Sequence, residues 1–171
     1  PTFVCFCSRN PKLQQNLLPV EFFHKIKSQH VFTVSGGGSI FLCDSLKRSQ
    51  KVQYISCHHE QAVAFAAEGY ARNSNDVGSA IVTTGPGGTN AITGVASCWI
   101  DSIPVIFISG QVFLNQTIEK TKLRQVGVQE INIIDLVRPI TKYAEIVKNK
   151  NNIKIHLDKC LHFSKSGRFG P

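Results

Sequence analysis

The sequence predicts a doubly wound α/β domain, in which a mainly parallel sheet carries helices on both faces. Short apolar runs alternate with helical segments along the chain, which is the order of a parallel sheet joined by crossover helices. Glycine-rich turns follow two of these runs, at residues 35–39 and 84–90. The 171 residues, with 42% hydrophobic and 18% charged side chains, suffice for one domain with a buried core.

Hydrophobic spacing places the expected elements. Helices are expected over residues 17–29, 40–47, 58–72, 91–99 and 153–164. Strands are expected over residues 31–34, 52–56, 79–83, 104–109 and 140–147. Residues 1–16 show neither pattern, so we expect an irregular N-terminal segment followed by a single domain over 17–171.

The positive charge of the chain does not indicate a nucleic-acid partner. The formal net charge is +8, from 19 Lys and Arg against 11 Asp and Glu. These cations are scattered singly and in pairs, and no basic stripe interleaved with aromatic side chains is present. The longest apolar runs, such as residues 104–108, are far too short to cross a bilayer. We therefore expect neither nucleic acid nor a membrane among the partners.

The six cysteines are expected to be unpaired thiols in a reducing, cytoplasmic protein. They form no Cys-x-x-Cys pair, so no zinc site is predicted. Cys57, His58 and His59 are adjacent, but consecutive side chains at a helix start diverge and rarely meet at one ion. The first residues do not resemble a signal peptide, and the abrupt ends of the sequence suggest a fragment.

Three expected strand ends carry the candidate binding residues. In open parallel sheets, ligands bind beyond the carboxyl ends of the strands, where loops lead into helices. The candidates are the glycine turn at 35–39, residues 58–60 and the loop at 84–90. Neither glycine loop fits the dinucleotide-binding fingerprint or carries the lysine of a phosphate-binding P-loop. Taken alone, each loop is more simply interpreted as a tight turn.

Glu60 is the most suggestive single residue, because it lies just past a strand end in the first turn of a helix. On spacing alone we interpret it as a capping acid, since the helix dipole favours an acid there by about 0.3–1 kcal/mol. A functional carboxylate is the other interpretation. Glu68, later on the same helix, is expected to be solvated or locally paired.

Several motifs in order resemble thiamine-diphosphate-dependent enzymes of the acetolactate-synthase type. Residues 59–72 (HEQAVAFAAEGYAR) resemble the segment that carries the catalytic glutamate, and residues 84–90 (TGPGGTN) resemble the next motif of the family. Four more motifs follow at family-like spacing: DSIP at 101–104, GQV at 110–112, VQE at 128–130 and RPITK at 138–142. The resemblance runs from about residue 22 to 171. It implies the thiamine-diphosphate-binding fold and, within it, the N-terminal pyrimidine-binding domain.

The resemblance also implies roles for particular residues. Glu60 would be catalytic, because a carboxyl group bonded to the cofactor's pyrimidine stabilises the imino tautomer that removes the thiazolium C2 proton. The implied cofactor-binding residues are Ser35, Gly36, Gly37, Glu60, Thr84, Pro86 and Asn90. Gln129 corresponds to a glutamine near the substrate, which would be a small 2-oxo acid that is decarboxylated, carboligated or both.

Other parts of the active site would lie outside this segment. In the family, a Gly-Asp-Gly…Asn motif in a separate domain of a partner chain binds the diphosphate and Mg²⁺, and nothing here matches it. We therefore expect no metal ligands in this chain, a homo-oligomer (dimer or tetramer), and no activity from this segment alone. FAD is possible in such an enzyme, but this segment gives no support for it.

The sequence departs from the acetolactate-synthase pattern near the substrate. Ser35 and Gly38 stand where Pro and Ala are usual, and Gly127-Val128 replaces an Ala-Phe pair. Cofactor activation is unaffected by these changes, but another 2-oxo acid, or a modified sugar or polyol, remains open as substrate. Two alternatives to an enzyme domain are a non-catalytic nucleotide-binding or regulatory α/β module and an inactive fragment.

Overall fold

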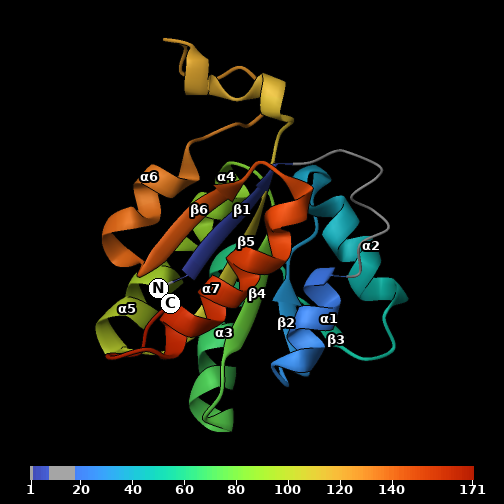
Figure 1. Ribbon diagram of the computed structural model, residues 1–171, viewed down its shortest axis with the longest axis vertical. Helices are drawn as coiled ribbons and strands as arrows, with labels where there is room; N and C mark the ends of the chain where they lie inside the picture. Colours follow the sequence, from blue (N-terminus) through green and yellow to red (C-terminus); the bar gives the residue numbers. More distant parts are fainter. Residues whose placement is uncertain (1, 8–17) are drawn as a thin grey trace.

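A six-stranded parallel sheet forms the centre of the computed structural model, which describes residues 2–7 and 18–171 (Figure 1). The strands are β1 (Thr2–Cys7), β2 (His30–Thr33), β3 (Gln53–Ser56), β4 (Gly78–Val82), β5 (Val105–Gln111) and β6 (Tyr143–Val147). Their order in the sheet is β3-β2-β4-β5-β1-β6, and every neighbouring pair is parallel. The predicted α/β fold with a parallel sheet is confirmed.

Helices cover both faces of the sheet. One face packs against α3 (Glu60–Ser74), α5 (Ile92–Asp101) and α6 (Ile133–Val137). The other packs against α1 (Leu18–Lys25), α2 (Ile40–Arg48) and α7 (Ile153–Lys165). Along β5, Phe107 belongs to the first core whereas Ile106 and Ile108 belong to the second. Both faces of this strand are therefore buried, which explains why it reads as a continuous apolar run.

The remaining elements are short. They are the helix α4 (Pro86–Asn90) and the 3-10 turns η2 (Gly37–Ser39), η3 (Leu114–Gln116), η4 (Ile118–Lys120), η5 (Arg138–Ile140) and η6 (Lys150–Asn152).

The elements differ from the sequence prediction in several places. Helix α1 ends at Lys25, before the expected residue 29, and β6 begins at Tyr143, after the expected residue 140. The segment 1–16, expected to be irregular, contains β1, while its residues 1 and 8–16 lie outside the described residues. The glycine loop at 84–90 contains the helix α4, because proline is well suited to a first helical position. Helix α3 begins at Glu60 rather than His58, and α6 had no counterpart in the prediction.

Several polar and sulfur-containing side chains have structural roles in this frame. The thiols of Cys98 and Cys160 are buried, and burial raises the pKa of both, so that they stay protonated. Glu68 is only 5% exposed and pairs with Arg72, which also binds Asp101. Of the two expected states of Glu68, local pairing is therefore the observed one. None of the helices described is both long and apolar enough to span a membrane.

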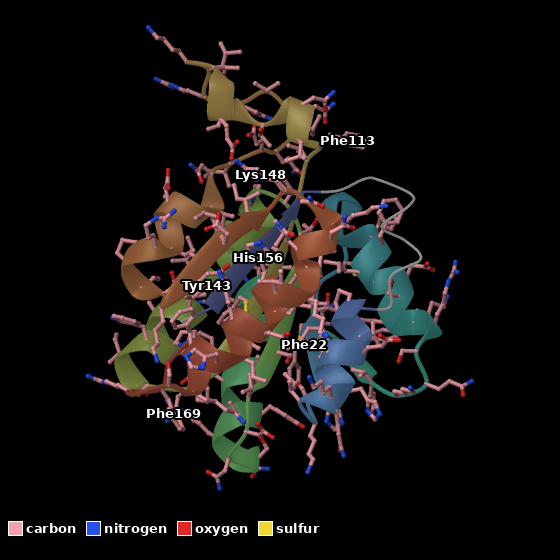
Figure 2. The ribbon with its side chains drawn as sticks, viewed as in Figure 1. Phe22, Phe113, Tyr143, Lys148, His156 and Phe169 are labelled. Carbon is pink, nitrogen blue, oxygen red and sulfur yellow. The ribbon has the colours of Figure 1, made fainter. Side chains whose placement is uncertain are left out.

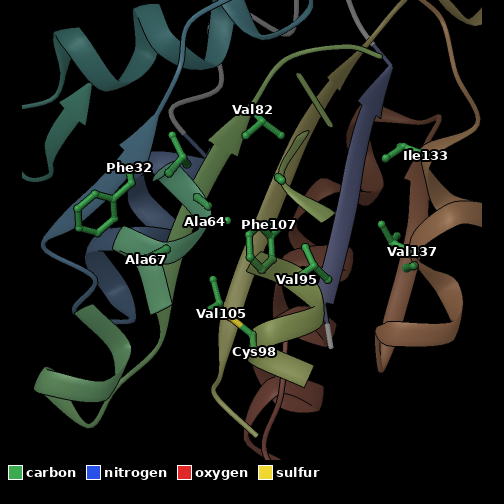
Figure 3. Packing of buried hydrophobic residues seen from close by; sticks show 14 of the residues in the cluster. Phe32, Ala64, Ala67, Val82, Val95, Cys98, Val105, Phe107, Ile133 and Val137 are labelled. Carbon is green, nitrogen blue, oxygen red and sulfur yellow. The ribbon is translucent and has the colours of Figure 1, made fainter. Parts of the chain in front are cut away.

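Small residues allow α3 and α5 to pack closely. Figure 3 shows Ala64 and Ala67 of α3 in the same core as Val95 and Cys98 of α5. Gly94 of α5 lies directly against α3, because a Cβ atom there would overlap the side chain of Ala64. The Ala-rich sequence of α3 is therefore a packing requirement as well as a helix-forming one.

We predict opposite effects of alanine at two helical glycines. Gly94→Ala should lower the free energy of unfolding by about 1–3 kcal/mol, because the new methyl group forces α3 and α5 apart. Gly69→Ala is the matched control, since a Cβ atom there meets nothing within 4 Å. It should raise stability by about 0.5–1 kcal/mol through helix propensity. Urea unfolding of the two variants checks this, and equal effects would contradict the close packing.

Candidate functional site

Loops from β2, β4 and β5 meet beyond the carboxyl ends of these strands. The backbone N–H of Gly38 donates to Thr83 Oγ1 at 3.2 Å, which joins the loop after β2 to the end of β4. The Ser109 hydroxyl on β5 donates to the carbonyl oxygen of Thr83 at 3.1 Å. A Cβ atom at Gly110 would overlap the backbone of Gly38. These contacts fix the three loops against one another.

The glycines after β2 are needed for this contact. A Cβ atom at Gly36 would lie 2.5 Å from the side chain of Thr83, and one at Gly38 would overlap the hydroxyl of Thr84. Any larger residue at these positions would displace the loop from the end of β4. Ser35 and Gly37 are exposed at the start of the same turn. The loop therefore exposes Ser35 and Gly37 to solvent, while its backbone at Gly36 and Gly38 packs against the end of β4.

Glu60 is half-buried at the start of α3, and its carboxylate contacts α4 rather than its own helix. Its Oε2 atom accepts a hydrogen bond from Asn90 Nδ2 at 3.0 Å. His59 makes the side-chain cap of α3, because its Nδ1 atom accepts from the N–H of Gln61 at 3.1 Å. A Cβ atom at Gly87 would lie 3.4 Å from Glu60 Oε1. The side chain of Glu60 is therefore held between α3 and α4 and is not used as a hydrogen-bonding cap.

Thr84 is the second unusual polar residue of the site. It is 6% exposed, and its Oγ1 atom has no hydrogen-bond partner within the described residues. Burying an unpaired hydroxyl costs stability. Pro86 is exposed at the first position of α4, next to this hydroxyl in the chain. The Thr84 hydroxyl is therefore an unpaired polar group that the backbone of Gly38 covers.

Gln129 reaches the same edge of the sheet from the chain segment after β5. Its backbone has a φ of 58°, and its side chain is exposed. A Cβ atom at Gly85 would overlap the carbonyl oxygen of Gln129, so the two backbones are in close contact. Gly85 has φ 60° and ψ −117°, a conformation open to glycine and costly for other residues. The structure thus brings every predicted site residue to one edge of the sheet.

Two residues that support the site were not among the sequence predictions. Thr83 and Ser109 hold the loops together, as described above. Both are polar residues at the ends of apolar strand runs, where a side chain begins to face the loop region. A polar residue at the end of an apolar strand run is the sequence signal that could have identified them. The described residues contain no group of three or more side chains placed to hold a metal ion.

An open parallel sheet with a fixed glutamate and an unpaired hydroxyl at its carboxyl edge defines a cofactor-binding α/β domain. Residues 19–136 match the family described as thiamine pyrophosphate enzyme, N-terminal TPP binding domain. The chain belongs to this family.

Similarity to several acetolactate synthases agrees with this assignment. The chain is 40% identical over 143 residues to the acetolactate synthase large subunit of Buchnera aphidicola subsp. Schizaphis graminum, which covers 84% of this chain and 24% of the relative. It is 36% identical over 143 residues to the acetolactate synthase isozyme 3 large subunit of Escherichia coli, with the same coverage. With the chloroplastic acetolactate synthase of Arabidopsis thaliana it is 34% identical over 174 residues, covering 99% of this chain and 24% of the relative.

The chain therefore spans about a quarter of the length of these relatives. The resemblance inferred from the sequence motifs is confirmed, and the alternative of a non-catalytic nucleotide-binding module is not favoured.

We predict that the two adjacent threonines of the site respond differently to valine. Thr83→Val removes the acceptor of the Gly38 N–H and should lower the free energy of unfolding by about 1–2 kcal/mol. Thr84→Val replaces an unpaired buried hydroxyl and should leave stability unchanged or raise it by up to about 1 kcal/mol. Urea unfolding of both variants without ligand tests the difference. Equal losses would mean that the Thr84 hydroxyl has a partner.

Proposed function

We propose that this domain binds the pyrimidine of thiamine diphosphate and activates that cofactor through Glu60, within an enzyme that acts on 2-oxo acids. The observation that carries the proposal is the placement of the Glu60 carboxylate. It lies at the carboxyl edge of the sheet, held through Oε2 by Asn90. We name thiamine diphosphate as the cofactor because the chain belongs to the thiamine pyrophosphate enzyme family.

The residues at the sheet edge fit such a ring. Since Asn90 occupies Oε2 of Glu60, Oε1 remains for a ring nitrogen. The Thr84 hydroxyl has no hydrogen-bond partner within the described part of the chain, and a ring could reach it only after a shift of the Gly38 backbone that covers it. Glycines at 36 and 37 leave the backbone open to a flat ring on the other side. We assign Ser35, Gly36 and Gly37 to one wall of the ring site, and Thr84, Pro86 and Asn90 to the other.

Glu60 acts by holding a proton at the pyrimidine nitrogen. When bound, thiamine diphosphate supplies a thiazolium carbon that becomes a nucleophile once it loses its proton. Glu60 shares a proton with the far side of the pyrimidine, and Asn90 fixes the orientation of the carboxylate by donating to it. Aspartate would be too short for the same contact, and glutamine has no proton to exchange. The chain thus contributes orientation and one mobile proton.

The remaining features of the enzyme are proposed from the family. A partner subunit's separate domain would hold the diphosphate and Mg²⁺, so the active form would be a homo-oligomer, either a dimer or a tetramer. The pyrimidine-binding domain would comprise residues 17–171 together with β1, which lies within the sheet. Gln129 would face the 2-oxo acid, which is decarboxylated or carboligated. Nothing in the described residues favours FAD. A cytoplasmic location accords with the free thiols of Cys43, Cys57 and Cys98.

We predict that Glu60→Gln, in the enzyme that contains this domain, slows the exchange of the cofactor's C2 proton by about 100-fold or more, in the range typical of a lost general acid-base. The fold should remain intact, because the glutamine oxygen still accepts from Asn90. Exchange into D₂O followed by NMR measures this. Glu21→Gln is the control, since Glu21 is also an acid in the first turn of a helix. A wild-type exchange rate in the Glu60 variant would mean that Glu60 only interacts favourably with the helix dipole and does not activate the cofactor.

We predict that the 171-residue chain alone binds thiamine diphosphate weakly or not at all, with or without Mg²⁺. The described residues offer a pyrimidine site but no cluster of metal ligands for a diphosphate-bound cation. Isothermal titration calorimetry of the chain with cofactor and Mg²⁺ tests this. Micromolar, Mg²⁺-dependent binding would overturn the division of the site between two domains.

A further inference from the structure

Residues 112–131 form a long excursion between β5 and α6, which we call the arm. Figure 1 shows it as the yellow and orange segment rising from the edge of the sheet. Phe113, labelled in Figure 2, lies where the arm leaves the domain. The outgoing limb contains η3 and η4, and the returning limb ends with Gln129 and Glu130. An excursion of this length without longer helices or strands needs specific contacts to hold one conformation.

The side chain of Glu130 provides those contacts. It is 7% exposed, and both of its oxygens accept backbone hydrogen bonds. Oε1 accepts from the N–H of Ile118 at 2.5 Å, and Oε2 accepts from the N–H of Val126 at 3.1 Å. Ile118 lies on the outgoing limb and Val126 on the returning limb, so one carboxylate joins the two. A carboxylate suits this position because it has two acceptor oxygens and forms stronger hydrogen bonds than a neutral group.

Two further contacts close the base of the arm. The N–H of Gly127 donates to the carbonyl oxygen of Gln116 at 2.9 Å. Gln111 Nε2, at the end of β5, donates to the carbonyl oxygen of Ile131 at 2.9 Å. The limbs are packed so closely that a Cβ atom at Gly127 would lie 2.8 Å from the side chain of Val112. Glu130 is thus the central contact of a closed base.

This base determines where Gln129 lies. Gln129 directly precedes Glu130 and has a φ of 58°, a left-handed conformation that is strained for a non-glycine residue. Such a conformation persists only where neighbouring contacts enforce it. On one side Glu130 is anchored to both limbs, and on the other the backbone of Gln129 lies against Gly85. The exposed side chains of Val128 and Gln129 are therefore carried by a backbone that Glu130 holds in place.

We propose that Glu130 is a positioning residue, whose carboxylate ties the two limbs of the arm together and so holds Gln129 against Gly85 at the rim of the cofactor site. Glu130 acts through Gln129 and does not contact the cofactor. The consequence for substrate binding rests on the proposed function, whereas the structural part of the proposal does not.

The structural part is tested by amide hydrogen exchange on Glu130→Gln in this chain. Glutamine has a single acceptor oxygen, so Ile118 or Val126 loses its partner, and the exchange of that amide should accelerate about tenfold or more. The amides of β4 and β5 should exchange at wild-type rates. Glu119→Gln is the matched control, because Glu119 is an exposed acid on the same arm, paired with Lys148 at 2.7 Å. Unchanged exchange at both Ile118 and Val126 would overturn the proposal.

The positioning part is tested by kinetics of Glu130→Gln in the assembled enzyme, with pyruvate as the probe 2-oxo acid. KM should rise about tenfold while kcat changes little, since a displaced Gln129 weakens substrate binding without altering Glu60. The C2 proton exchange of bound cofactor should stay at the wild-type rate. The proposed function is tested by the loss of C2 proton exchange in Glu60→Gln, and the positioning role by the KM of Glu130→Gln. Either one can therefore fail without the other. An unchanged KM in Glu130→Gln contradicts the positioning role.

A variant with both acceptor oxygens guards against simple misfolding. Glu130→Asp keeps the charge and both oxygens but shortens the side chain by one methylene group. It should give amide exchange and KM between those of the wild type and Glu130→Gln. If Glu130→Asp and Glu130→Gln both match the wild type in every measurement, the bridging carboxylate is irrelevant and the proposal is wrong.

Discussion

The candidate site depends on the close approach of the Gly38 backbone to Thr84 and Gly110. The carboxyl ends of parallel strands always share one edge of a sheet, but their loops meet only where side chains leave room. A side chain at Gly38 or Gly110 would push the loop after β2 away from those after β4 and β5. The two proposed walls of the ring site would then separate. The glycine run is therefore a steric condition for the site as well as a turn.

Two carboxylates at this edge of the molecule illustrate how environment divides their roles. Glu130 is buried, and two backbone N–H groups use both of its oxygens, so it can only hold structure. Glu60 is half-buried, and Asn90 engages one of its two oxygens. In the proposed function, the same chemical group thus serves as a fixed link at Glu130 and as the carboxylate that activates the cofactor at Glu60. Hydrogen-bond occupancy, more than residue type, separates them.

The sequence sufficed for five of the six described strands and for most helices, because continuous apolar runs and helical spacing are strong local signals. It also sufficed to bring the candidate site residues to strand ends, which the sheet then gathers at one edge. The strand at Thr2–Cys7 escaped prediction, since its pairing partners, β5 and β6, are far away in the sequence. Helix α4 was hidden by glycines that normally indicate a loop. Two side-chain contacts also escaped prediction: Glu60 with Asn90, and Glu130 with Ile118. Each joins separate segments of the chain, and hydrophobic spacing does not predict which segments meet.

The position of β1 has a consequence for the order in which the chain acquires its structure. Thr2 pairs with Ile106 on one side and with Tyr143 on the other, so the earliest strand waits for partners more than a hundred residues later. Contacts between residues so far apart in sequence form slowly, because the entropy of closing a large loop is lost before the strand hydrogen bonds can offset it. During synthesis, β2, β3 and β4 can associate while the slot between β5 and β6 does not yet exist. Insertion of β1 is therefore expected to be the last and slowest step in assembling the sheet.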